Sequence, residues 1–365
     1  MGQREDRKFS KISFSASAGL SLFLSVILIL FLELVLRLVS FQYISGINFA
    51  YPLPSEMDFF SPDPDLFWKL NPAKSQANSL GMPGPELHKK QKNTFRLLFL
   101  GDSCVWVGYP NGYPQKTADL LNAMPQKNNL YEPVVFAVPG YSSHQGRVLA
   151  EKYAKSAEAD IVFVSFGWND HWLAFGKVDS EKRVLLTGNA SVRFINQIYQ
   201  KSRLLQFGRK MVDTALGKNK PLNETRVSLE EYSQNLLKIK SVFGNTPVVF
   251  MTPPTSYYRL GIPPLFYTRQ GWKNKEWLLA IHREYNQEVR KIAKMPGAYL
   301  LDLEERASAL PAEKLKEMFT DGIHFSGKGS DWAAQEVSRF LIENNLVPPS
   351  NPRTPELLLI EKKEG

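Results

Sequence analysis

The sequence contains a single cysteine, Cys104, in 365 residues, and this scarcity limits what the chain can be. One cysteine excludes an intrachain disulfide, and no spacing typical of a zinc site is present. The net charge of +9 comes from scattered lysines and arginines rather than from one basic tract, and no RNA-binding signature occurs. We therefore expect no nucleic acid as a partner. The apolar fraction of 43% is typical of a protein with a packed core, and no internal repeat is visible.

Charge is also missing between Ile12 and Leu32, a segment that is dense in large apolar residues from Leu20 onward. At a rise of about 1.5 Å per residue, a helix of this length spans the roughly 30 Å hydrocarbon core of a bilayer. Glu33 and Arg37 follow the segment, one helical turn apart, and are expected to pair at its end. The segment therefore predicts a transmembrane helix.

The basic residues nearest to this helix lie almost wholly on its N-terminal side. None occurs between Arg37 and Lys69, whereas four precede the helix, at Arg4, Arg7, Lys8 and Lys11. The positive-inside rule predicts a cytoplasmic tail over 1–11, a signal anchor over 12–40, and a periplasmic or extracellular remainder. A cleaved signal peptide is the alternative, but no clear A-x-A site follows the apolar core. A domain outside the cytoplasm without disulfides favours a bacterial inner-membrane protein.

Residues 41–94 are rich in proline and aromatic residues, and this composition cannot hold a long helix. We interpret them as a connecting region that packs on the domain through aromatic side chains such as Phe59, Phe60, Phe67 and Trp68.

Five short apolar runs follow, separated by segments with helical periodicity. They predict a parallel sheet with right-handed crossovers in an α/β domain over 95–346, followed by a tail over 347–365. Residues 171–228 interrupt the pattern without a clear strand, which indicates an insertion, helical in part, beside the site. The runs are centred on residues 96–100, 133–138, 160–166, 247–251 and 298–303.

Polar residues that suit ester cleavage follow three of these runs. Ser103 comes after the first strand, where a nucleophile or a helix cap would lie. A serine nucleophile needs a base, an orienting acid and donors for an oxyanion. Asp321 precedes His324 by three residues, a spacing that lets the carboxylate reach Nδ1 while Nε2 faces elsewhere. The backbone N–H groups of Ser103 and Gly140 and the side chain of Asn169 are the candidate donors. We expect Gly101 to free the backbone so that Ser103 can present both its hydroxyl and its N–H.

Four segments together resemble, in order and separation, the four sequence blocks of the SGNH (GDSL-type) hydrolases. The resemblance covers about residues 95–346. Two departures are an apolar run, Val135-Phe136-Ala137, where members often carry an asparagine, and the lack of the usual leucine after the serine. The four segments are Gly101-Asp102-Ser103, Gly140, Gly167-Trp168-Asn169-Asp170 and Asp321-Gly322-Ile323-His324.

The resemblance implies a flavodoxin-like three-layer α/β/α fold and the hydrolysis of esters, often acyl groups on carbohydrates and lipids. It implies Ser103 as nucleophile, His324 as general base and then acid, and Asp321 as its orienting partner. Ser103, Gly140 and Asn169 would form the oxyanion hole. No cofactor or metal is expected.

Other residues lie close to these blocks and have two interpretations. Aromatic residues there either stack on a sugar ring or form core and lid, and Asp170 is expected to brace the loop that holds Asn169. His144 is more typical of a packed or solvated histidine than of a catalytic one. Cys104 is expected to be a small buried residue at the head of a helix. The candidate pocket residues are Trp106, Tyr141, Trp168, Asp170 and His171.

The sequence thus predicts a membrane-anchored serine esterase that removes an O-acyl group, in particular O-acetyl, from a cell-envelope glycan or lipid. One alternative is an O-acyltransferase that uses the same residues with a sugar hydroxyl as acceptor. A second is a non-catalytic binding or assembly protein that retains the fold. The oligomeric state is not predicted.

Overall fold

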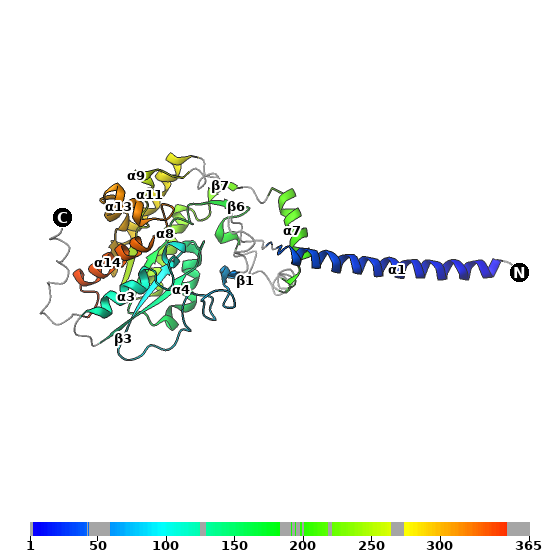
Figure 1. The fold of residues 1–365 in the computed structure, drawn as a ribbon, viewed down its shortest axis with the longest axis horizontal. Coiled ribbons are helices and arrows are strands. Elements are labelled where there is room, and N and C mark those ends of the chain that lie inside the picture. Colours follow the sequence, from blue (N-terminus) through cyan, green and yellow to red (C-terminus); the bar gives the residue numbers. More distant parts are fainter. Residues whose placement is uncertain are drawn as a thin grey trace.

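A computed structural model describes residues 3–41, 43, 59–124, 129–182, 191, 194, 198, 201–217, 221–263 and 274–348. One long helix extends from an α/β domain, so the chain has an elongated shape with its N-terminus at the far end of the helix (Figure 1).

The domain is built on a five-stranded sheet in which all neighbouring strands are parallel. The spatial order is β4-β3-β5-β8-β9, which places the first strand of the sheet between the second and the third, as in flavodoxin-like folds. All five predicted strands are confirmed. Pro133 lies on β4 at the sheet edge, where a missing N–H costs no ladder bond on the outer side. The strands are β3 (Thr94–Gly101), β4 (Leu130–Ala137), β5 (Ile161–Ser165), β8 (Val248–Met251) and β9 (Ala298–Leu301).

Helices cover both faces of this sheet, which confirms the three-layer α/β/α fold. Alternate side chains of β3 enter separate apolar clusters, Leu98 and Leu100 in one and Leu97 and Phe99 in the other, as the two-residue period of a strand requires. The first cluster includes α4 (Ser143–Ala157), α8 (Leu229–Val242) and α11 (Lys275–Ile292). The second includes α3 (Tyr113–Ala123), α12 (Leu303–Ser308), α13 (Ala312–Met318) and α14 (Gly327–Glu343).

The described part of the connecting region packs on the domain. It forms an antiparallel pair, β1 (Phe60–Asp63) and β2 (Phe67–Leu70), and buries Phe67 and Trp68 in the first cluster. Trp68 also donates its ring N–H to the carbonyl of Pro139, just before Gly140. The connecting region therefore supports a loop of the candidate site. The rest of it, residues 44–58, lies outside the described residues, as does the C-terminal tail from 349 onward.

The insertion differs from its expectation because it contains strands. The three-residue β6 (Leu173–Phe175) pairs in antiparallel fashion with β7 (Pro221–Thr225), and strands this short show too few alternations to be recognised in a sequence. A helix, α7 (Arg203–Ala215), lies between them in the chain and packs against the long N-terminal helix.

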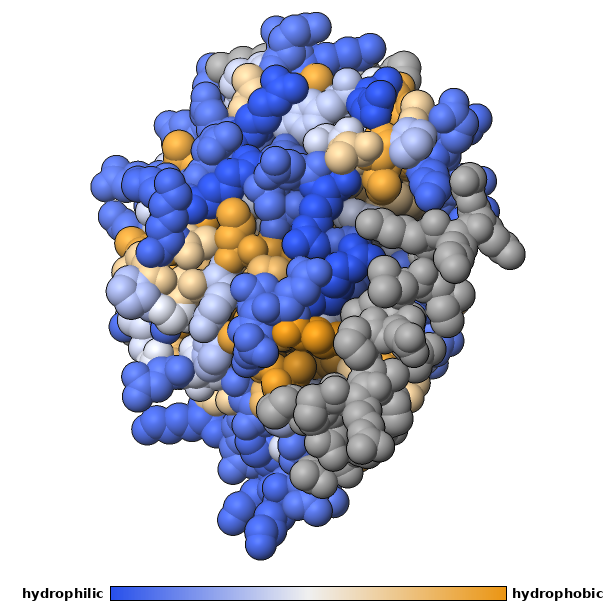
Figure 2. All heavy atoms as spheres, turned by 90° about the vertical axis from the view of Figure 1, so that its left-hand side faces the viewer, coloured by the Kyte–Doolittle hydropathy of each residue, from blue (hydrophilic) through white to orange (hydrophobic). Residues whose placement is uncertain are grey.

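The long N-terminal helix α1 runs from Gln3 to Leu38, so the residues predicted as a tail begin the same helix. Its Ser17–Leu38 segment is long and apolar enough to cross a membrane, and none of it is buried against the domain, unlike the core helix of a soluble protein. The expected pair of Glu33 and Arg37 is confirmed by an ion pair of 2.7 Å. The opposite end of the molecule shows a mostly hydrophilic surface (Figure 2).

Candidate active site

Ser103 lies where β3 ends and a four-residue helix, α2 (Ser103–Trp106), begins. Asp102 caps this helix, because its Oδ1 accepts a hydrogen bond of 2.8 Å from the Cys104 N–H. In the sheet register Gly101 lies opposite Ala137 of β4 and Ser165 of β5. The segments that carry Gly140 and Asn169 therefore leave the sheet on either side of the Ser103 segment.

Gly101 is required for space rather than for backbone freedom, which corrects the expectation. A Cβ at this position would lie 2.3 Å from Cγ2 of Val105 and 2.8 Å from the carbonyl oxygen of Ser165. The glycine thus allows α2 to fold back tightly over the ends of two strands, and this places Ser103 at the sheet edge.

The structure brings Ser103, His324 and Asp321 into one hydrogen-bonded chain. Ser103 Oγ lies 2.8 Å from His324 Nε2, and His324 Nδ1 lies 2.7 Å from Asp321 Oδ2. An ionised Asp321 accepts a hydrogen bond from Nδ1–H, so the neutral imidazole keeps a lone pair on Nε2 for the serine hydroxyl. The arrangement can therefore take a proton from Ser103 as its oxygen attacks a carbonyl.

Backbone donors hold the carboxylate of Asp321 in this position. Its Oδ1 accepts from the N–H groups of Ile323 at 3.1 Å and His324 at 2.9 Å. Burial opposes ionisation of Asp321, but these bonds and the bond to the His324 ring outweigh it, so the pKa of Asp321 lies below its usual value. Asp321 is therefore ionised at neutral pH.

The loop that carries Asp321 and His324 is bound to the segment that follows β8. Tyr257, the first residue of α9 (Tyr257–Leu260), donates its hydroxyl to the carbonyl of Asp321 at 2.8 Å, and Thr255 donates to the carbonyl of Gly322 at 2.8 Å. Gly322 has a φ of +98°, and a Cβ there would lie 2.0 Å from the Tyr257 ring. Only glycine fits this turn.

Asn169 is oriented by Asp102, the residue before Ser103. Its buried side chain donates one N–H to Asp102 Oδ2 at 2.9 Å, which leaves the second N–H of the amide for another acceptor. Burial raises the pKa of Asp102, while its bonds from Cys104 and Asn169 act in the opposite direction. Asp102 therefore links the helix that carries Ser103 to the Asn169 loop, a role that the sequence analysis did not assign to it.

Gly140 is held by an arginine of the insertion that the sequence analysis also missed. Arg226 donates Nη1–H to the carbonyl of Gly140 at 2.8 Å, and its Nη2 pairs with the buried Asp179 at 2.7 Å. Burial opposes ionisation of Asp179, but the charges of Arg226 and Lys182 hold its pKa below the usual value. Gly140 has a φ of +83°, a conformation that favours glycine. No local sequence signal marks Arg226, because the contact joins segments 86 residues apart.

Most of the candidate pocket residues are buried rather than open. The side chains of Tyr141, Trp168, Asp170 and His171 are each at most 1% exposed, so they support the site from beneath and do not face a substrate. Tyr141 donates its hydroxyl to the carbonyl of Trp68 at 2.6 Å. The sequence alone could not show that these side chains belong to the core and do not stack on a sugar ring.

Two of these buried residues form polar contacts behind the Asn169 loop. Asp170 Oδ1 accepts from the Ser143 N–H at 2.8 Å and so joins the loop to the start of α4, as expected of a brace. Its Oδ2 has no hydrogen-bond partner among the described residues, and burial raises the pKa of Asp170 to about 7. His171 Nε2 lies 3.0 Å from His282 Nδ1, and the Trp168 ring stacks on the His282 ring.

Cys104 is buried, as expected, beneath the loop of His324. Its Sγ lies 3.6 Å from the carbonyl oxygen of Ile323, and burial raises the pKa of the thiol well above its usual value. A protonated and enclosed thiol is a poor nucleophile. Ser103 is therefore the nucleophile candidate of this segment.

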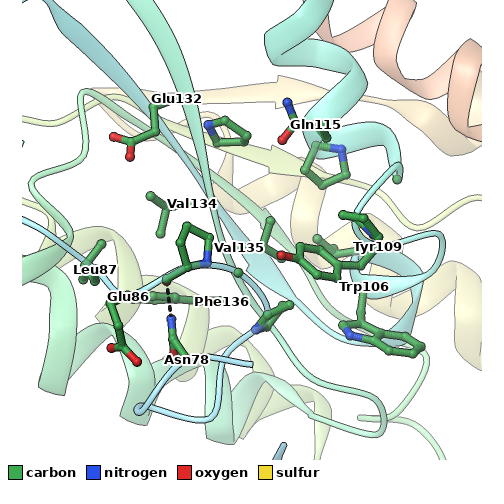
Figure 3. A pocket seen from close by; sticks show the side chains of 18 residues that line it. Asn78, Glu86, Leu87, Trp106, Tyr109, Gln115, Glu132, Val134, Val135 and Phe136 are labelled. Carbon is green, nitrogen blue, oxygen red and sulfur yellow. Dashed lines mark hydrogen bonds between the residues drawn. The ribbon is translucent and has the colours of Figure 1, made fainter. Parts of the chain in front are cut away.

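A pocket lies beside the site, between the connecting region and β4 (Figure 3). Trp106 and Tyr109, which follow Ser103, line one part of it, and Glu86, Leu87 and Glu132 line another. Trp106 is thus a candidate pocket residue that lines this cavity. Ser103, Asp321 and His324 are not among the lining residues.

A search of curated proteins gave no match. A lipase/acylhydrolase from Enterococcus faecalis is a similar solved structure, with 15% identity, a TM-score of 0.45, and coverage of 70% of this chain and 100% of its own. An acetyl xylan esterase, AlAXEase, has 17% identity, a TM-score of 0.43, and coverage of 68% and 100%. An acetyl xylan esterase from Geobacillus stearothermophilus has 17% identity, a TM-score of 0.41, and coverage of 70% and 97%.

The sequence model of the "GDSL-like Lipase/Acylhydrolase family" matches residues 99–332, which is more than half of the chain. This stretch begins within β3 and ends within α14, so it includes every segment that contributes to the hydrogen-bonded chain. The chain therefore belongs to the GDSL-like lipase/acylhydrolase family of ester hydrolases.

Proposed function

We propose that this protein is a membrane-anchored serine esterase that removes a small O-acyl group, such as O-acetyl, from a cell-envelope glycan or lipid outside the cytoplasm. The observation that carries the catalytic part is the chain from Ser103 Oγ through the His324 ring to Asp321, with contacts of 2.8 and 2.7 Å. A serine, a histidine and a carboxylate in this order are what acyl transfer through a covalent intermediate requires.

In the first half-reaction, Ser103 Oγ attacks the ester carbonyl while its proton passes to His324 Nε2. The bond from Oγ to carbon forms, and the carbonyl oxygen becomes an oxyanion. The second N–H of Asn169 and the backbone N–H groups of Ser103 and Gly140 are the proposed donors to that oxyanion. The bond from carbon to the alcohol oxygen then breaks, and the alcohol leaves with the proton from His324.

In the second half-reaction, water attacks the acyl-enzyme and gives a proton to His324. The tetrahedral intermediate collapses, the bond from carbon to Oγ breaks, and the proton on His324 returns to Ser103. The products are a carboxylic acid, the free alcohol and the unmodified enzyme. Asp321 stays ionised throughout and stabilises the imidazolium that forms in each half.

Exposure of the catalytic side chains supports a bulky alcohol component. The side chain of His324 is 23% exposed and that of Asp321 is 42% exposed, so the hydrogen-bonded chain lies at an open edge of the domain. Immediately behind it, Cys104, Trp168, Tyr257 and Ile323 belong to a packed apolar cluster. An open front suits a glycan or lipid headgroup, while a filled back suits a short acyl group.

The exposed apolar helix α1 supports the membrane anchor. Glu33 and Arg37, near its C-terminal end, make contacts with the rest of the chain, which favours a retained helix over a cleaved signal peptide. The basic residues that precede the apolar segment favour a cytoplasmic N-terminus and a domain on the other side.

Labelling with a fluorophosphonate tests the nucleophile on the full-length protein in detergent. We expect wild type and the control Ser308→Ala to be labelled, because Ser308 lies on the exposed side of α12. Ser103→Ala should not be labelled. Equal labelling of the Ser103→Ala protein, or a folded wild type that remains unlabelled, would refute the proposal and favour a non-catalytic role.

Incubation with an acetyl ester and a candidate glycan distinguishes the hydrolase from the transferase. We expect free acetate to form at the same rate with and without the glycan. If acetylated glycan formed in preference to free acetate, the acceptor would be a sugar hydroxyl instead of water. The protein would then be an O-acyltransferase.

A further inference from the structure

We propose that α7 is an interfacial helix that lies on the outer surface of the lipid bilayer, with its apolar face in the lipid. This inference rests on the proposed membrane anchoring by α1 but not on the esterase chemistry. It gives the insertion a function, namely to fix the height and orientation of the catalytic domain above the membrane.

The polarity of α7 is inverted with respect to a helix of a soluble domain. Its buried residues are polar, Gln206 at 1% and Asp213 at 3% exposure. Its large apolar side chains are exposed instead. Leu205, Val212 and Leu216 are spaced by seven and four residues and so share one face, with exposures of 49%, 52% and 63%. In water such a face would be unfavourable, whereas in lipid it would be stabilising.

The polar inner face is used by the segment that follows α1. Tyr43 donates its hydroxyl to Asp213 at 2.8 Å and its backbone N–H to Gln206 Oε1 at 3.0 Å. The side chains of Gln206 and Asp213, which a soluble helix would present to water, are thus directed toward the protein. This arrangement leaves the apolar face of α7 directed outward.

Glu33 of α1 holds the N-terminus of α7. Its carboxylate accepts from the N–H groups of Arg203 at 3.0 Å and Leu204 at 2.8 Å, two donors that the first turn of a helix cannot satisfy internally. Arg37 donates to the carbonyl of Lys201 at 2.7 Å. The two helices therefore meet at a defined junction.

The position of Glu33 in the sequence sets the level of this junction. No charged residue occurs between Ile12 and Leu32, and Glu33 is the first charge after them. Because that uncharged segment is about as long as the hydrocarbon core is thick, Glu33 lies at the boundary between hydrocarbon and headgroups. The start of α7 is bonded to Glu33 and lies at the same boundary.

The direction of α7 and its charges suit that boundary. In Figure 1, α7 lies beside the C-terminal end of α1 and runs across its direction, as a helix in the membrane plane would. Lys201 is an exposed basic residue that can reach lipid phosphates, whereas the exposed Arg209 pairs with Asp213 at 3.0 Å. The apolar face of α7 lies next to α1, whose exposed apolar surface is proposed to lie in lipid. This proximity favours the bilayer over a second protein chain as the partner of the α7 face.

Fluorescence quenching in nanodiscs tests the inference on the full-length protein. The discs contain phosphatidylethanolamine, phosphatidylglycerol and a lipid with a shallow doxyl quencher. A fluorophore is attached to a cysteine introduced at one site per variant, and the enclosed Cys104 leaves wild type as the unlabelled control. Val212→Cys reports the apolar face, Lys210→Cys the opposite face, Leu24→Cys the centre of α1 and Ser308→Cys the distant domain surface.

We expect the label at Val212 to be quenched several-fold more than the labels at Lys210 and Ser308. A quenched α1 label with an unquenched Val212 label would overturn the inference and leave the anchor intact. Equal quenching on both faces of α7 would also overturn the inference, because a helix in the membrane plane has one face in the lipid and the opposite face outside it. An unquenched α1 label would remove the anchor and the inference together.

A charged variant provides a second measurement. Leu205→Asp combined with Val212→Asp should abolish quenching of a label at Leu216→Cys on the same face, while hydrolysis of a small soluble ester stays unchanged. Quenching that persists in this variant would contradict a lipid-facing apolar surface. Absence of esterase activity in every variant, with the quenching pattern intact, would refute the proposed chemistry and leave this inference standing.

Discussion

The catalytic edge of the sheet and the junction of α1 with α7 both depend on a carboxylate that accepts backbone N–H groups. At the edge, Asp321 accepts from residues two and three positions along its own loop. At the junction, Glu33 accepts from residues about 170 positions away. The first arrangement is local and is encoded in one short motif. The second exists only when two distant helices meet. It holds α7 against α1 and takes no part in the proposed ester cleavage. Substitutions at the two places should therefore have different consequences.

The largest effect is expected from loss of the base. His324→Ala removes the group proposed to accept the Ser103 proton, so kcat for ester hydrolysis should fall by about 10³-fold or more, with little change in thermal stability. Steady-state kinetics with a soluble acetyl ester measure the change, and Lys328→Ala on the nearby exposed surface is the control. A loss smaller than tenfold would assign the proton transfer to another group.

An intermediate effect is expected at the proposed oxyanion donor. Asn169→Ala should lower kcat by about 10²- to 10³-fold with a small change in KM, because the amide N–H acts mainly on the transition state. Asn169→Asp retains the shape but removes the donor and should lower activity as well. If Asn169→Ala changed KM and left kcat intact, Asn169 would bind the ground state instead.

A smaller effect, on stability, is expected from the buried carboxyl of Asp170. Burial raises its folded-state pKa to about 7 from the ordinary 3.8, so the folded protein binds a proton that the unfolded chain has already lost between these values. Stability of wild type should therefore fall as pH rises from about 4 to 7, relative to Asp170→Asn, whose amide does not titrate in that range. Urea unfolding of both proteins at pH 5 and pH 8 measures this difference. If the free energy of unfolding changed equally with pH in the two proteins, the pKa of Asp170 would not be raised by folding.

The smallest effect on catalysis is expected at the junction. Glu33→Ala removes the acceptor for the first turn of α7, a loss of about 1 kcal/mol of local stability by analogy with helix caps. Trypsin should then cleave faster near α7, whereas hydrolysis of a soluble ester should be unchanged. Glu343→Ala, on an exposed turn of α14, is the control. A large loss of activity in Glu33→Ala would mean that the junction also shapes the active site.

The same contrast explains how much could be predicted from the sequence. The five strands were recognisable because each is an apolar run that ends at a turn, and three of the four site blocks follow such ends. The bond of Arg226 to Gly140 and that of Asp102 to Asn169 were not predictable, because each joins segments that only the fold brings together. The three-residue β6 was missed because it is too short to show a period, and the purpose of Gly101 was misjudged because a close contact leaves no mark in a sequence.

If the domain lies outside the cytoplasm, as proposed, the burial of Cys104 bears on its resistance to oxidation. A compartment that lacks reducing agents oxidises accessible thiolates to sulfenic acids or mixed disulfides. The sulfur of Cys104 is buried against Ile323 with its pKa raised, so it offers neither access nor a thiolate. The enzyme therefore carries its only thiol next to the proposed nucleophile, Ser103, without exposing the active site to oxidative inactivation.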